Sequence, residues 1–202
     1  MSALVLAASA VLVDGRTWLE GGGLLIASGR VVRPLVSPAA VRRAARSAPG
    51  VDVRPLVLTA GLVNAHAHLE LSGLAGRLPR GGAFGPWISR LLELRAQRGA
   101  RGLARDAARG AERCLATGTT LVGDLDTTGA AERGLARPPL RVRLGREVLD
   151  AQDPLRTAPA LKRAGAPRPA TRRLRIGLAA HAPFSASPAL LQGLGRLARR
   201  HE

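Results

Sequence analysis

The stretch that decides the fold is Leu58-Thr59-Ala60-Gly61-Leu62-Val63-Asn64-Ala65-His66-Ala67-His68-Leu69-Glu70. An apolar run leads to two histidines that stand two residues apart. In a β-strand, residues i and i+2 point to the same face, so a strand here presents both imidazoles side by side. Neutral imidazole is a ligand for Zn, Fe or Ni, and His66 and His68 are therefore candidate metal ligands. The alternative is that the two histidines alternate on a strand and bind no metal.

Downstream of this stretch, apolar runs alternate with segments of helical period. One helix is predicted over residues 87–117, ahead of Gly118, and another begins at Ser187, an N-cap residue followed by Pro188. The pattern of strand, helix, strand, helix predicts a parallel α/β sheet. The apolar runs that predict its strands are residues 55–63, 119–125, 140–149 and 174–180.

The number of these units indicates a partial barrel. A (β/α)8 TIM-type barrel uses about 31 residues per unit, and only four strands can be identified, so residues 56–202 are predicted to form about four βα units. Residues 1–55 contain short β-like runs separated by glycine turns, with residues 3–13 expected as one strand and 37–50 as a short helix or a loop. They are predicted to form a small β-sandwich-like N-terminal domain.

Two further segments strengthen the pattern. Gly118-Thr119-Thr120-Leu121-Val122-Gly123-Asp124 would be a second barrel strand, and Arg175–Pro188 contains His181-Ala182-Pro183-Phe184 after a fourth. With the first stretch, these segments resemble the amidohydrolase superfamily, particularly its chlorohydrolase and deaminase branch, which includes aminofutalosine-type deaminases. The resemblance implies that His66 and His68 bind a divalent metal, Zn or else Fe, and that His181 binds substrate.

The resemblance also implies a function. Members of this branch are metal-dependent hydrolases of non-peptide C–N bonds, in which metal-bound hydroxide attacks an amide, an aminopurine or a related ring. Their remaining metal ligands and their general base lie on later strands, and after His181 this sequence offers only His201 and Glu202. No catalytic base is identified, and we expect the chain to be the truncated N-terminal half of such a barrel, with impaired activity.

Two other functions stay open. The chain could be a non-catalytic remnant or a half-barrel interaction module that pairs with a second copy or with a separate C-terminal half. It could also be a basic nucleic-acid-binding protein, because 31 basic against 14 acidic residues give a net charge of +17. Against that reading, the arginines are spread along the chain, and only two Trp and two Phe are available to stack on bases.

The remaining features are expected to be structural. Cys114 is the single cysteine, which excludes an intramolecular disulfide, and it is expected to be a small buried residue on a helix. Glu70 and Trp87 could line the mouth of the site, but we expect Glu70 to be a solvated carboxylate and Trp87 to be a packed indole. No run approaches the roughly 20 apolar residues of a membrane helix, so a soluble, cytoplasmic protein is expected.

Overall fold

The structure is a computed structural model that describes residues 3–165 and 171–200. His201 and Glu202, the two residues that the sequence offers after His181, lie outside the described residues. The chain divides into two compact units, residues 1–61 and 62–202, and each is considered by itself. The sequence placed the boundary after residue 55, whereas strand β7 (Val57–Leu58) pairs with β2 (Ala10–Leu12) and so belongs to the first unit.

The first unit contains two small sheets. In one, with strand order β5-β4-β1-β6, β1 pairs antiparallel with β4 and parallel with β6; the other has the order β3-β2-β7. A small antiparallel β layer was expected, and the β1–β4, β4–β5 and β2–β3 pairs confirm it, whereas β1–β6 and β2–β7 pair in parallel. The bounds of the remaining strands are β1 (Ala3–Ala7), β3 (Trp18–Glu20), β4 (Gly23–Ala27), β5 (Arg30–Leu35) and β6 (Gly50–Asp52).

The structure tests the predictions made for two segments of this unit, residues 3–13 and 37–50. Residues 3–13 form two strands rather than one, because the chain turns between Ala7 and Ala10 and the two halves enter different sheets. Within the segment 37–50, helix α1 (Pro38–Ala44) forms, since Ser37 accepts a hydrogen bond from the Ala40 amide and Pro38 occupies the first turn.

The second unit is built on a four-stranded sheet of order β11-β10-β9-β8, parallel throughout. All four strands lie within or close to the predicted apolar runs, and the predicted parallel α/β class is confirmed. The bounds predicted for the first of these strands were wrong, because the run 55–63 splits between β7 and β8 at Gly61. The strands are β8 (Leu62–Ala67), β9 (Thr119–Asp126), β10 (Arg141–Val148) and β11 (Leu174–Ala180).

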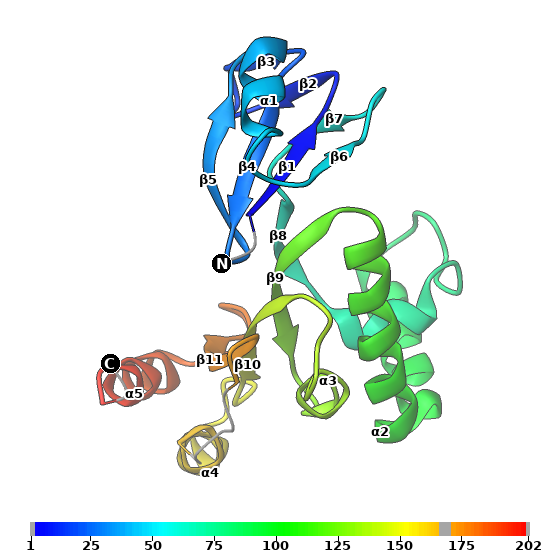
Figure 1. Cartoon of the computed structure of the whole chain (residues 1–202). Helices are drawn as coiled ribbons and strands as arrows, with labels where there is room; N and C mark the ends of the chain where they lie inside the picture. The colour runs from blue at the N-terminus through cyan, green and yellow to red at the C-terminus, as the bar shows by residue number, and fades with distance from the viewer. Residues whose placement is uncertain (1–2, 166–170, 201–202) are drawn as a thin grey trace. The chain divides into compact units, whose positions relative to one another are not determined.

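Helices cover one side of this sheet, as Figure 1 shows for α2 to α5. The predicted helix over 87–117 is present as α2, with a break at Gly99, whose φ of 61° and ψ of 167° are not helical. The predicted helix after Ser187 is confirmed, with the Ser187 side chain accepting from the Leu190 amide. The helices are a 3-10 segment η1 (Leu69–Leu74), α2 (Phe84–Ala116), α3 (Ala130–Gly134), α4 (Pro154–Ala164) and α5 (Pro188–Ala198).

The core of the second unit lies between the sheet and these helices. Val122, Val142 and Leu144 alternate along β9 and β10 and pack with Ala107 and Ala111 of α2. Since neighbouring residues of a strand face opposite sides, the residues between them point away from the helices. We call this other side of the sheet the inner face, because it corresponds to the interior of a barrel. Among the described residues, no helix combines the length and the apolar character that crossing a membrane requires.

Candidate metal and substrate site

His66 and His68 lie at the carboxyl end of β8, on the inner face. Ala67 between them packs against the helix-side core, so both imidazoles point the other way. Their ring centroids are 5.3 Å apart and the ring planes meet at 72°. The structure therefore brings the two predicted ligands together as neighbouring, solvent-accessible rings.

The donor set fits part of a metal site. Two adjacent imidazoles can share one cation, but a catalytic zinc site uses three protein ligands and an open position. Among the described residues, no group of three or more His, Cys, Asp or Glu side chains is arranged to hold a metal ion. The pair thus supplies two ligands, and any third donor has to come from elsewhere.

A buried carboxylate network anchors the backbone that follows the two histidines. The Leu69 amide donates to Asp124 Oδ1 at 2.7 Å, and the Thr128 hydroxyl donates to Glu70 Oε2, which ties η1 to the end of β9. Glu70 is only 1% exposed, so the expectation of a solvated carboxylate is wrong. The sequence could not reveal this burial because the partner of Glu70 is 58 residues away.

Two carboxyls of this network are hard to ionise. Burial raises the pKa of Asp124 to about 7, and the nearby charges of Asp126 and Glu70 act in the same direction. Burial likewise raises the pKa of Glu70. Asp124 Oδ2 is buried and has no hydrogen-bond partner among the described residues, which fits a carboxyl that is protonated near neutral pH. The Asp126 side chain accepts from the amides of Thr128, Gly129 and Glu132 at the start of α3.

His181 follows β11 directly and is held by its own loop. Its backbone amide donates to the Val148 carbonyl, and its Nδ1 lies 2.7 Å from Ser185 Oγ. The Ser185 hydroxyl also lies 3.1 Å from the Ala182 carbonyl, and in the tautomer in which it donates there, Nδ1 donates to Ser185 Oγ. In that tautomer Nε2 of the neutral ring is a hydrogen-bond acceptor.

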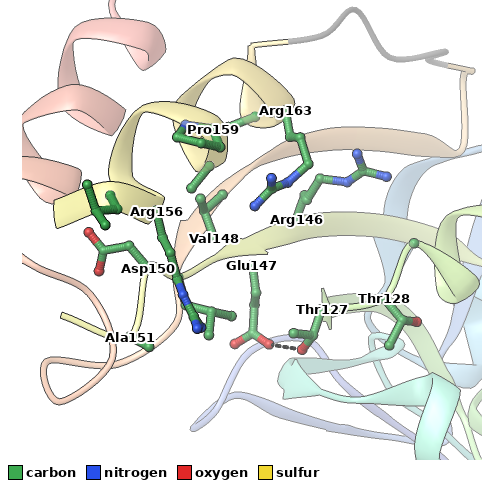
Figure 2. Close-up of a pocket in the computed structure, with 15 residues that line it drawn as sticks. Thr127, Thr128, Arg146, Glu147, Val148, Asp150, Ala151, Arg156, Pro159 and Arg163 are labelled. Carbon is green, nitrogen blue, oxygen red and sulfur yellow. Dashed lines mark hydrogen bonds between the residues drawn. The ribbon is translucent and has the colours of Figure 1, made fainter. Parts of the chain in front are cut away.

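The inner face carries two polar residues that the sequence analysis did not single out. Glu147 near the end of β10 is 7% exposed, and Thr127, just after β9, donates to its Oε2 at 2.5 Å. Both also contribute to the lining of a pocket of about 640 Å³ that lies on the helix side, between α4 and the loops after β9 and β10 (Figure 2). Neither histidine of the pair lines this pocket. The signal that could have identified Glu147 was a carboxylate within the predicted strand run 140–149, near its carboxyl end.

The Trp87 indole was expected to be packed, and it packs against a neighbour on its own helix. Trp87 is half-buried and stacks on Phe84 with centroids 6.2 Å apart, both at the start of α2. Cys114 is half-buried on the same helix and packs against the core, and burial raises the pKa of its thiol.

Comparison with known proteins finds the fold in solved structures. No family model and no curated protein matches the sequence. A triazine hydrolase from Arthrobacter aurescens matches with a TM-score of 0.76 and 16% identity, over 100% of this chain and 51% of its own. The Helicobacter pylori aminofutalosine deaminase, in complex with methylthio-coformycin, matches with a TM-score of 0.76 and 20% identity, over 98% and 48%.

A third match is the guanine deaminase of C. acetobutylicum with bound guanine, with a TM-score of 0.68 and 14% identity, over 99% of this chain and 51% of its own. The atrazine chlorohydrolase of Arthrobacter aurescens, also similar, was crystallised with zinc. These matches show that the chain shares its fold with the triazine hydrolase and the two deaminases. The chain spans about half the length of the structures it matches.

Proposed function

We propose that this chain provides part of the active site of a metal-dependent hydrolase that acts on non-peptide C–N bonds, as a deaminase or an amidohydrolase. The observation that carries the proposal is the pair of imidazole rings, 5.3 Å apart on the inner face at the carboxyl end of β8. In α/β barrels, the carboxyl ends of the strands are where the chemistry takes place. The fold shared with deaminases and a chlorohydrolase supports the same reading.

His66 and His68 would hold a divalent cation, with zinc favoured over iron. Bound there, such a cation would supply the Lewis acidity that activates water near neutral pH. The pair accounts for only two ligands, so we expect the 202 residues to bind zinc more weakly than a complete site does and to turn over substrate slowly or not at all. The carboxylates buried beneath η1 keep the backbone after His68 in place.

His181 would orient a small-molecule substrate, which we expect to be an amide, an aminopurine or a related ring. Its Nδ1 is engaged by Ser185, so Nε2 is the atom that remains for a ligand. In the tautomer whose Nδ1 carries the proton, Nε2 accepts a hydrogen bond, which suits an N–H group of the substrate.

Zinc titration tests the proposal. At pH 7.5, isothermal calorimetry of the native chain is expected to give one zinc per chain, and the double variant His66→Ala, His68→Ala is expected to lose it, while His181→Ala retains it. Lowering the pH to 5.5 should weaken binding, because imidazole must be deprotonated to coordinate a metal. Zinc binding that survives the double variant would refute the proposed metal site.

A second candidate is an interaction module. In the four-stranded sheet, β8 and β11 each have a strand neighbour on one side only, and unpaired strand edges are templates for association. Light scattering distinguishes this possibility. A protein that is monomeric over a wide concentration range and also binds zinc would favour the hydrolase, whereas a stable dimer without zinc binding would favour the module.

A further inference from the structure

The inner face carries two arginines side by side on neighbouring strands. Arg143 of β10 and Arg175 of β11 are registered partners, and both are exposed. Leu144 and Ile176, which follow them, pack with the helix-side core, so the two arginines alternate onto the inner face. Neighbouring strands lie about 4.8 Å apart, and like charges at that spacing destabilise a sheet unless they are compensated.

No acidic side chain compensates this pair. Among the described residues, neither arginine lies within ion-pair distance of a carboxylate. Glu147, the acidic residue of β10, stands four residues beyond Arg143, or about 13 Å along the strand. Asp124 and Asp126 of β9 accept from backbone amides at the start of η1 and of α3. The two guanidinium groups therefore keep their full positive charge.

A hollow lies beside the two arginines. Its volume is about 310 Å³, and it is lined by Arg143, Leu144, Gly145, Arg175, Ile176 and Gly177. Gly145 and Gly177 are registered partners, and a Cβ added at Gly177 would meet nothing within 4 Å, so the surface of the sheet is open there. The volume is at the lower end of the range for small-molecule sites, and no Asp or Glu of the described chain lines the hollow.

More positive charge surrounds the start of the same two strands. A second hollow, of about 360 Å³, is lined in part by Arg141, Arg172 and Arg173, and again by no described Asp or Glu. The Arg173 guanidinium donates to the carbonyls of Pro138 and Pro139, which are neutral and leave its charge in place. A group of arginines without carboxylates raises the local concentration of anions.

We propose that Arg143 and Arg175 bind a small ligand that carries linked phosphate groups, such as pyrophosphate or tripolyphosphate. A guanidinium group pairs with two oxygens at once, which occupies a whole carboxylate but leaves a terminal phosphate group a further oxygen for the second arginine. A linked second phosphate extends the negative charge toward Arg141. Neither His66 nor His68 lines the hollow, and β9 lies between β8 and β10, so the inference does not rest on the proposed function.

Titration of the metal-free chain with tripolyphosphate tests the proposal. By calorimetry at low salt, with EDTA present, the native chain is expected to bind one tripolyphosphate. The double variant Arg143→Gln, Arg175→Gln is expected to bind it about tenfold or more weakly, because hydrogen bonds between charged groups are strong. The control variant Arg101→Gln, Arg105→Gln removes the same charge from two exposed arginines of α2 and should stay within about threefold of the native affinity.

Two further measurements separate the site from net charge and from folding. Gly177→Val fills the hollow without changing the charge, so it should also weaken binding. Without ligand, the urea midpoint of the double arginine variant should equal or exceed that of the native chain, because the like-charged pair is gone.

Several outcomes would overturn the inference. They are no binding of tripolyphosphate by the native chain, undiminished binding by the double arginine variant or by Gly177→Val, and equal weakening in the control variant. An oligoglutamate peptide or a short oligonucleotide that binds as tightly as tripolyphosphate would overturn it as well, since charge alone or a nucleic acid would then explain the binding. None of these measurements involves zinc, so their result is independent of the zinc titration that tests the proposed function.

Discussion

Replacing Asp124 by Asn should change how the stability of the second unit depends on pH. The native pKa of Asp124 is raised by burial to about 7 from an ordinary value of 3.8. Between these values the folded state binds a proton that the unfolded state has released, so stability falls as pH rises. From pH 5 to pH 8 this linkage corresponds to a loss of about 2.5 kcal/mol of unfolding free energy from this group alone.

The Asn side chain cannot ionise, and its carbonyl can still accept from the Leu69 amide. We therefore expect Asp124→Asn to be less stable than the native chain, or equal to it, at pH 5 and more stable at pH 8. The fall in unfolding free energy between the two pH values should shrink by about 2.5 kcal/mol. A smaller decline should remain, because burial also raises the pKa of Glu70.

Urea unfolding followed by tryptophan fluorescence measures this difference. Trp18 lies in the first unit and Trp87 in the second, so a Trp18→Phe background makes Trp87 the reporter of the unit that contains Asp124. Glu112→Gln, which removes an exposed carboxylate from the same unit, is the control and should decline as the native chain does. If Asp124→Asn loses as much stability from pH 5 to pH 8 as the native chain, the assignment of the buried proton is refuted.

Three further predictions concern the same unit. Gly123→Ala should destabilise the second unit by about 1–3 kcal/mol, since an added Cβ would meet the Ala65 carbonyl oxygen at 2.6 Å. At Gly177 an added Cβ would meet nothing within 4 Å, so Gly177→Ala should be tolerated. The urea midpoints of the two variants measure the difference. Ser187→Ala should cost about 1–2 kcal/mol by the same measurement, because it removes the cap of α5 and a bond to Asp150. Burial acts to raise the pKa of Asp150, but hydrogen bonds from Ser187 and Thr157 outweigh it and lower the pKa to about 2. The ionised Asp150 should therefore stabilise the fold above pH 4, and this stabilisation should be lost as the pH falls through 2. Acid unfolding checks this, because Asp150→Asn should lack that pH dependence.

The strands and the two long helices of the second unit were predictable because their signals are local. Apolar runs of strand length and the Ser187-Pro188 start of α5 depend on neighbours in sequence. Helix α4 has a similar start at Asp153-Pro154, yet it was missed, and Pro159 within it interrupts the helical pattern. The split of the run 55–63 at Gly61 was missed because it depends on long-range pairing: β7 pairs with β2 in one sheet and β8 with β9 in another.

The candidate site was predictable to the extent that it follows strand alternation. His66 and His68 needed only a period of two, and the placement of His181 followed from its position after an apolar run. The burial of Glu70 and the bond from Thr127 to Glu147 depend on which strands lie side by side, and the residues that meet are 58 and 20 positions apart. No window of local sequence contains that information.

The break at Gly99 gives α2 two parts with different anchoring. The part after it contributes Ala107 and Ala111 to the helix-side core, whereas Leu94 is the buried side chain of the part before it. Arg98 Nε bridges the break to the buried Asp106 at 2.7 Å. Hydrogen exchange of the amides before Gly99 should therefore proceed through a local opening that leaves the sheet closed, and burial of Leu94 and the Arg98–Asp106 ion pair both oppose that opening.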